Sequence, residues 1–351
     1  MTILKERAVG ASLPLGGGLS SRAISPPLLT PPLTPPMVRR VNRSGIMLVG
    51  ITAKITSTLL FAGMLALVKY YSAYPIAELV FFRSAFALFV LVFWLLMRGD
   101  FPRALYTKWL SGHLVRSVAG VGSMFLMFAA YGILPLADVT AIGYAAPLLI
   151  VVFAALLLRE KVNAGRWAAV CVGFGGVIVM LWEHLGAGLK SANAIGALCA
   201  LSGAALVSIA MIQTRRLTRT EDTGAIVFYF QGTTTLASLL VLLLAEIWPS
   251  DWLLGAVLHS QVWIWPEAAH WWPLICTGLL GGAGQIFMTQ SYRYTDASIV
   301  ACFDYTSMIW ALVLGFVMFG ELPAAIALIG AAIIACGGLL AIFSERAARK
   351  A

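Results

Sequence analysis

Five charged residues stand inside strongly apolar stretches of this sequence, where charges are rare. They are Lys54, Arg83, Arg116, Glu78 and Asp304. In the middle of a membrane helix a charge costs about 2.5–3.5 kcal/mol even on the lenient insertion scale, so it normally faces a partner, water or a polar path. Arg83 and Asp304 lie deepest in their stretches. We therefore expect both to face one central space, where they are paired directly or bridged by water or a solute.

The other three charges lie nearer the ends of their stretches. Long side chains such as Lys54 and Arg116 can reach the membrane surface while their stems stay in the apolar layer. For these two residues, binding of a solute is the alternative role. Both add positive charge on the cytoplasmic side, which favours a solute with anionic or electron-rich character.

Two tyrosines and one amide complete the candidate site. Tyr144 and Tyr305 occupy matching positions in two similar halves of the chain, and Gln285 is a lone amide among glycines. Such residues can stack on and hydrogen-bond a planar organic solute, although buried tyrosines also pack well without a ligand. The predicted substrate-binding residues are Lys54, Arg83, Arg116, Tyr144, Gln285, Asp304 and Tyr305.

The composition requires a bilayer around most of this chain. Of its 351 residues, 60% are hydrophobic and only 11% are charged, which lies outside the range of soluble domains. A membrane helix needs about 20 apolar residues, and backbone groups in lipid must be satisfied within the helix. The sequence predicts ten such helices, at 45–68, 75–97, 111–133, 138–158, 165–183, 192–213, 224–246, 271–290, 297–319 and 323–343.

An internal repeat organises these helices. The segment Tyr131–Val177 aligns without gaps with Tyr292–Gly338, and the alignment pairs Tyr144 with Tyr305 and Glu160 with Glu321. Each half holds five predicted helices, and an odd number places the second half upside down relative to the first. The predicted fold is therefore an all-α polytopic membrane protein with two inverted five-helix repeats, 45–183 and 192–343. Inverted repeats are typical of secondary transporters, whose site lies at the repeat interface.

The net charge of +9 comes from residues in loops next to the predicted membrane helices, which argues against a nucleic-acid-binding patch. Most Lys and Arg residues lie in short loops on one side, and only Lys69 and Lys190 lie in loops on the other side. The positive-inside rule then predicts both termini in the cytoplasm. The Pro-rich segment 1–44 is expected to be a disordered cytoplasmic tail, and 344–351 a second cytoplasmic tail.

No enzyme motif is visible. The sequence has no GxSxG, no HExxH, no phosphate-binding Gly-Lys-Ser/Thr loop and no cluster of metal ligands. The scattered cysteines are expected to be packing residues. We therefore predict no catalytic residues, no metal and no cofactor. A membrane enzyme or lipid-processing protein is the alternative of another class, and it would need a nucleophile or a metal set.

Three stretches resemble the EamA family of the drug/metabolite transporter superfamily. They are Tyr74–Arg83, Asp138–Pro147 with Glu160-Lys161, and Asp296–Val300 continuing through Asp304-Tyr305 to Gly320-Glu321. The resemblance covers about residues 45–343. It implies a basket of ten helices around a central cavity and alternating access for a small metabolite without ATP.

Within that family the Phe-Phe-Arg83 and Phe303–Ser307 stretches are most similar to riboflavin or S-adenosylmethionine transporters. Exporters of amino acids or drug-like compounds are the alternative. The expected partners are a small-molecule substrate and the lipid bilayer, and nucleic acid is not expected. A homo-oligomer is a further alternative. The expected location is the bacterial inner membrane. Glu160 and Glu321, which end their spans at opposite faces, are expected to be structural and not proton carriers.

Overall fold

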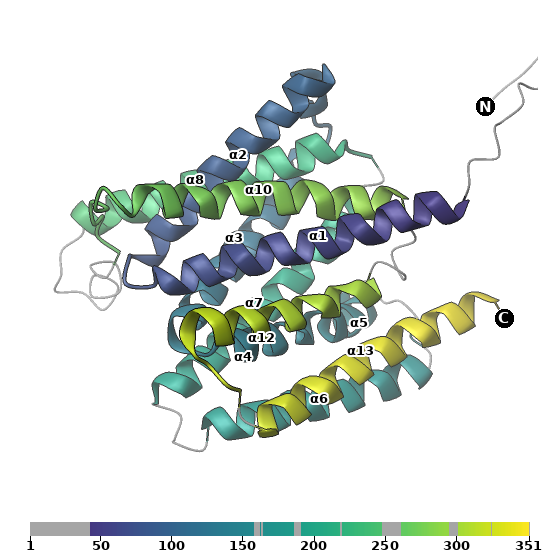
Figure 1. The fold of residues 1–351 in the computed structure, drawn as a ribbon. Coiled ribbons are helices and arrows are strands. Elements are labelled where there is room, and N and C mark those ends of the chain that lie inside the picture. The colour runs from purple at the N-terminus through teal and green to yellow at the C-terminus, as the bar shows by residue number, and fades with distance from the viewer. Residues whose placement is uncertain are drawn as a thin grey trace, which may run out of the picture. The chain divides into compact units, whose positions relative to one another are not determined.

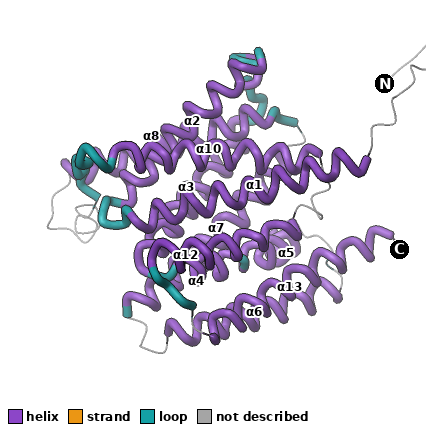
Figure 2. Tube along the Cα trace, in the orientation of Figure 1, coloured by secondary structure: helices purple, strands orange, loops and turns teal. Residues whose placement is uncertain are grey.

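The computed structural model describes residues 43–157, 162, 164–185, 191–217, 220–247, 261–294, 301–323 and 325–350. All regular elements in these ranges are helices (Figure 2). The proposed N-terminal tail, except for its last two residues, and Glu160 lie outside the described residues. The first described helix begins at Arg43, and the last ends at Lys350 within the expected C-terminal tail.

The first half of the sequence forms seven helical elements. These are α1 (Arg43–Tyr70), α2 (Ile76–Arg98), the short 3₁₀ helix η1 (Arg103–Leu105), α3 (Leu110–Ile133), α4 (Leu136–Gly143), α5 (Ala145–Leu157) and α6 (Ala164–Leu185). The long apolar runs predicted these helices to within a few residues. The exception is the fourth predicted span, 138–158, which is divided into α4 and α5.

The second half follows the same pattern. Its described elements are α7 (Ala192–Leu217), α8 (Thr223–Ile247), α10 (Trp271–Tyr294), the 3₁₀ helix η2 (Ala301–Tyr305), α12 (Thr306–Phe319) and α13 (Ala325–Lys350). Six helices of the described chain are long and apolar enough to cross a membrane, namely Met47–Tyr70, Ile76–Arg98, Leu110–Ile133, Leu136–Leu156, Ala192–Thr214 and Thr223–Ile247. Shorter apolar helices cover Trp167–Trp182, Phe303–Phe319 and Leu328–Leu340.

In both halves one helical element ends and the next begins at the matched tyrosine. In the first half, α4 ends and α5 begins around Tyr144, whose N–H donates to Ala141 O at 3.1 Å. Pro147 accounts for this break, since it lacks an N–H and clashes with the preceding turn. In the second half, η2 gives way to α12 directly after Tyr305, although Met308 stands where the first half has proline. A proline thus explains the first interruption, whereas the second has no comparable residue in the sequence.

Close helix pairs hold the bundle together. Helix α1 lies beside α10, and α6 lies beside α13 (Figure 1). Glycines make the second pair tight, because a Cβ on Gly337 would lie 2.5 Å from the Gly173 Cα, and one on Gly176 would lie 2.6 Å from the Gly330 carbonyl oxygen. In lipid, helices associate through such close backbone packing.

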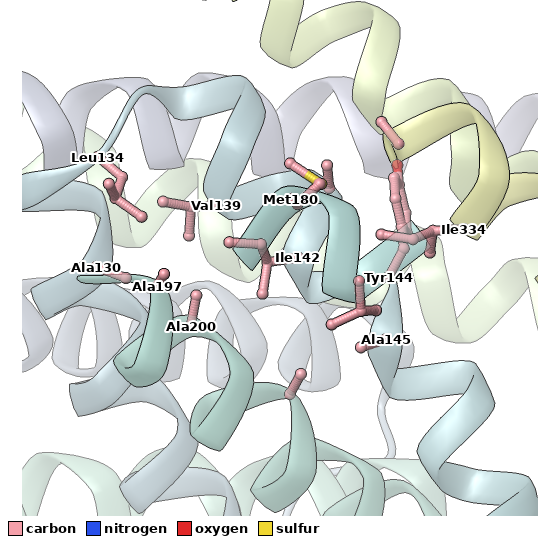
Figure 3. Close-up of a cluster of buried hydrophobic side chains, with 14 of the residues drawn as sticks. Ala130, Leu134, Val139, Ile142, Tyr144, Ala145, Met180, Ala197, Ala200 and Ile334 are labelled. Atoms are coloured by element: carbon pink, nitrogen blue, oxygen red, sulfur yellow. The ribbon is translucent and has the colours of Figure 1, made fainter. Parts of the chain in front are cut away.

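The largest buried core lies around α4 and α5. Val139, Ile142 and Leu148 are fully buried there, with Met180 from α6 and Ile334 from α13 packed against them (Figure 3). Tyr144 belongs to the same cluster. This core therefore fixes the position of the helix interruption at which Tyr144 stands.

Candidate functional site

A cavity of about 200 Å³ lies between α1, α4, α10 and α12. One face of α1 lines it, because Lys54, Thr58, Phe61, Ala62 and Leu65 are spaced by three or four residues. Tyr144, Asp304 and Ser307 also line it. The remaining wall is mostly apolar, so the polar groups are few and concentrated.

An ion pair stands in this cavity. Lys54 Nζ lies 2.5 Å from Asp304 Oδ1, and the Lys54 side chain is 2% exposed while that of Asp304 is 38% exposed. Asp304 stands in η2, directly before α12. Its carboxylate is therefore accessible from the cavity, whereas the Lys54 ammonium is reached mainly through its partner.

The direct Arg83–Asp304 pair is wrong, since Asp304 pairs with Lys54. Arg83 donates from Nη1 to Gln231 Oε1 at 2.7 Å, and Arg116 donates from Nε to Thr214 Oγ1 at 2.7 Å. Helices α2 and α3 thus direct these arginines toward α8 and α7. Four of the predicted site residues are absent from the residues that line the cavity, namely Arg83, Arg116, Gln285 and Tyr305.

Tyr144 is anchored by its hydroxyl. It donates to the Asp304 backbone oxygen at 3.0 Å and shares a short hydrogen bond with Ser307 Oγ. The ring packs on Tyr305, with centroids 4.8 Å apart and planes inclined by 47°. The two rings therefore do not offer a pair of free faces for a planar solute in this conformation, because each covers part of the other.

The Thr58 hydroxyl adds a neutral polar group to the cavity wall. Thr58 Oγ1 lies 2.8 Å from Thr306 Oγ1 and accepts a hydrogen bond from Trp310 Nε1 at 3.3 Å. Sequence reasoning did not select Thr58 as a site residue. Its position one helical turn after Lys54 was the available signal, since residues four apart share a helix face.

A second ion pair stands near the other end of the cavity wall. Lys69 Nζ lies 2.9 Å from Glu321 Oε1 and donates to the Leu134 carbonyl oxygen at 2.6 Å. Glu321 Oε2 accepts the Leu136 backbone N–H at 3.0 Å. This arrangement ties α1 and the segment after α12 to the start of α4. Among the residues that the structure describes, no group of three or more His, Cys, Asp or Glu could hold a metal ion.

Comparison with known proteins assigns the family. The EamA-like transporter family matches residues 46–182 and 194–343. A pseudopaline exporter of Pseudomonas aeruginosa is 29% identical over 85% of this chain and 95% of its own length. An S-adenosylmethionine uptake transporter of Rickettsia prowazekii is 25% identical, covering 77% and 83%, and a riboflavin transporter of Brucella anthropi is 26% identical, covering 74% and 85%.

The fold is also found in a solved structure. One crystal structure aligns with a TM-score of 0.57 at 24% identity, over 85% of this chain and 97% of the other. The family match covers most of the apolar sequence and both candidate halves, and several similar proteins are named as transporters. The chain therefore belongs to the EamA-like transporter family.

Proposed function

We propose that this membrane protein transports a small zwitterionic metabolite through the Lys54–Asp304 cavity by alternating access. The ion pair carries the proposal. A zwitterion can place its carboxylate at the Lys54 ammonium and its own ammonium at Asp304, so both charges of the pair keep an opposite charge beside them when the solute binds. A solute with only one of these charges would separate the pair without replacing both of its contacts.

This proposal orders the candidate solutes. S-adenosylmethionine and free amino acids carry an ammonium and a carboxylate, whereas riboflavin carries neither. The cavity of about 200 Å³ is smaller than the usual ligand site of roughly 300–1,000 Å³. It accommodates an amino-acid head group, and a larger solute requires the walls to separate. The mutual packing of Tyr144 and Tyr305 gives planar stacking a smaller role.

We further propose that the ten helices form an inverted repeat in the bacterial inner membrane. Both termini would then lie in the cytoplasm. The contact between Tyr144 and Tyr305 supports it, since repeat-related residues touch each other only where they lie close to a pseudo-two-fold axis. Single cysteines introduced at Arg98 and in the 247–270 loop should be labelled from opposite sides. Labelling of both from one side would refute this topology.

Transport assays test the substrate class. Purified protein in proteoliposomes should take up labelled S-adenosylmethionine or an amino acid such as methionine, and leave riboflavin outside. Asp304→Asn should abolish this uptake, while Arg98→Gln, at an exposed position outside the cavity, serves as the matched control. Riboflavin transport that is unchanged by Asp304→Asn would overturn the zwitterion proposal.

A further inference from the structure

Two arginines are buried on the side of the bundle formed by α2, α3 and α8. Arg83 is 5% exposed and Arg116 is 8% exposed. Their guanidinium carbons lie 6.0 Å and 4.5 Å from the centroid of the same ring, that of Phe230. Both cations thus lie against one ring, and like charges held this near each other in a poorly screened interior repel. The ring attracts both cations, but it carries no net charge that could balance them.

Their hydrogen-bond partners are neutral as well. Arg83 bonds to the Gln231 amide and Arg116 to the Thr214 hydroxyl. Arg83 Nε, Arg116 Nη1 and Gln231 Nε2 are buried donors with no acceptor among the described residues. Each guanidinium has five N–H groups, so several donors of this cluster are unused. A buried cation in this condition is costly, by several kcal/mol on general grounds.

The acids on neighbouring segments are engaged elsewhere. Glu78, five residues before Arg83 on α2, accepts the Ile264 backbone N–H through Oε2 at 3.1 Å, and its Oε1 contacts no donor among the described residues, Arg83 included. Glu221, in the turn before α8, accepts the Lys108 backbone N–H at 3.0 Å and lies 3.7 Å from His113. Within the described part of the chain, neither arginine forms an ion pair.

We propose that Arg83, Arg116 and Gln231 form a second binding site, which takes an oxyanion such as a carboxylate or phosphate. Arginine forks match two oxygens of such a group, and charge-assisted bonds of this kind are about twice as strong as neutral ones. The Gln231 amide supplies a further donor. Neither arginine lines the Lys54–Asp304 cavity, so this site goes beyond the transport proposal and does not depend on it.

Thermal unfolding of the purified full chain in detergent tests the site without any transport step. The buffer is bis-tris propane neutralised with the acid of the anion under test, which is acetate, inorganic phosphate or chloride. Acetate and phosphate should raise the Tm above its value in chloride, by about 3–5 °C at 100 times Kd, because a ligand that binds only the folded state stabilises it. Stronger stabilisation by acetate points to a carboxylate of an organic solute, and stronger stabilisation by phosphate points to the inorganic ion.

Variants locate the effect. Arg83→Gln and Arg116→Gln should each remove the difference between oxyanions and chloride. Arg98→Gln should retain it, and Arg98 is a matched control because its guanidinium also lies over a ring, that of Trp94 at 4.7 Å, but is exposed and lies 3.3 Å from Asp100.

Gln231→Glu should raise the stability of the protein, whereas the arginine variants should lose the response to oxyanions. The new carboxylate would stand where Oε1 now accepts from Arg83, at 2.7 Å, and would act as a built-in oxyanion. This variant should unfold at a higher Tm in chloride and should no longer respond to acetate or phosphate. Equal stabilisation by all three anions, an unchanged response in both arginine variants, or a lower Tm for Gln231→Glu would each overturn the proposal.

Discussion

Lys54 and Arg83 are both basic residues on long apolar helices, yet they meet different surroundings. Lys54 contacts an acid, Asp304, in the wall of a cavity, whereas Arg83 contacts a neutral amide and shares the Phe230 ring with a second cation. The first arrangement is balanced within the protein, and the second is balanced only when an anion arrives. The position of each residue within its apolar stretch does not distinguish the two cases. The distinction depends on which neighbouring helix the side chain contacts.

The largest effect is expected from breaking the balanced pair. Asp304→Asn removes the carboxylate that faces the buried Lys54 ammonium. Losing one partner of a buried pair costs about 3–5 kcal/mol, less here because Asp304 is partly open to the cavity. We expect a lower Tm and at least a tenfold loss of transport. The double variant Lys54→Met/Asp304→Asn should regain stability but not transport. A stable Asp304→Asn single variant would contradict this account of the pair.

Removing one of the two arginines should act in the opposite direction. In chloride buffer, Arg116→Gln takes away one of two buried cations that lie against the same ring. The free energy of unfolding should stay unchanged or rise by about 1 kcal/mol, so the Tm should not fall. Thermal unfolding beside Asp304→Asn gives the comparison directly. Destabilisation of similar size in both variants would show that the two regions do not differ.

A smaller loss is expected from the hydroxyl of Tyr144. Tyr144→Phe keeps the ring against Tyr305 and removes the hydrogen bonds to Asp304 O and Ser307 Oγ. A net hydrogen bond is worth about 1 kcal/mol, so stability should fall by about that amount. Transport should weaken through a higher KM, because the segment that carries Asp304 is held less firmly. An unchanged KM would mean that Ser307 holds this segment alone.

The smallest effect should come from the other ion pair. Glu321→Gln retains an oxygen for the Leu136 N–H and loses only the charge facing Lys69, in a partly exposed position. Such pairs contribute about 0–1 kcal/mol. Transport and its pH dependence should persist. Loss of the pH dependence at normal protein levels would identify Glu321 as a proton carrier.

The sequence predicted the helices well because an apolar run of membrane length has few alternatives in lipid. It also predicted Asp304 as a residue of the cavity. It did not predict the partners, since Lys54 meets Asp304 and Arg83 meets Gln231 across long stretches of chain. Gln231 and Thr214 escaped selection because a neutral residue costs little in an apolar run. The interruption after Tyr305 escaped because no proline marks it.

The glycine contacts between α6 and α13 bear on how the protein is made. The two helices are far apart in the sequence, so on the ribosome α6 must wait on the order of 10 s for its partner, at synthesis rates of about 5–20 residues per second. During that time its Gly173 and Gly176 surface faces lipid or a chaperone. The Tyr305 hydroxyl lies against Gly338 of α13, so the arrival of α13 also sets the tyrosine pair beside the cavity. The ability to transport is therefore acquired late in biosynthesis, and truncations that remove α13 should be cleared by membrane quality control although Lys54 and Asp304 remain intact.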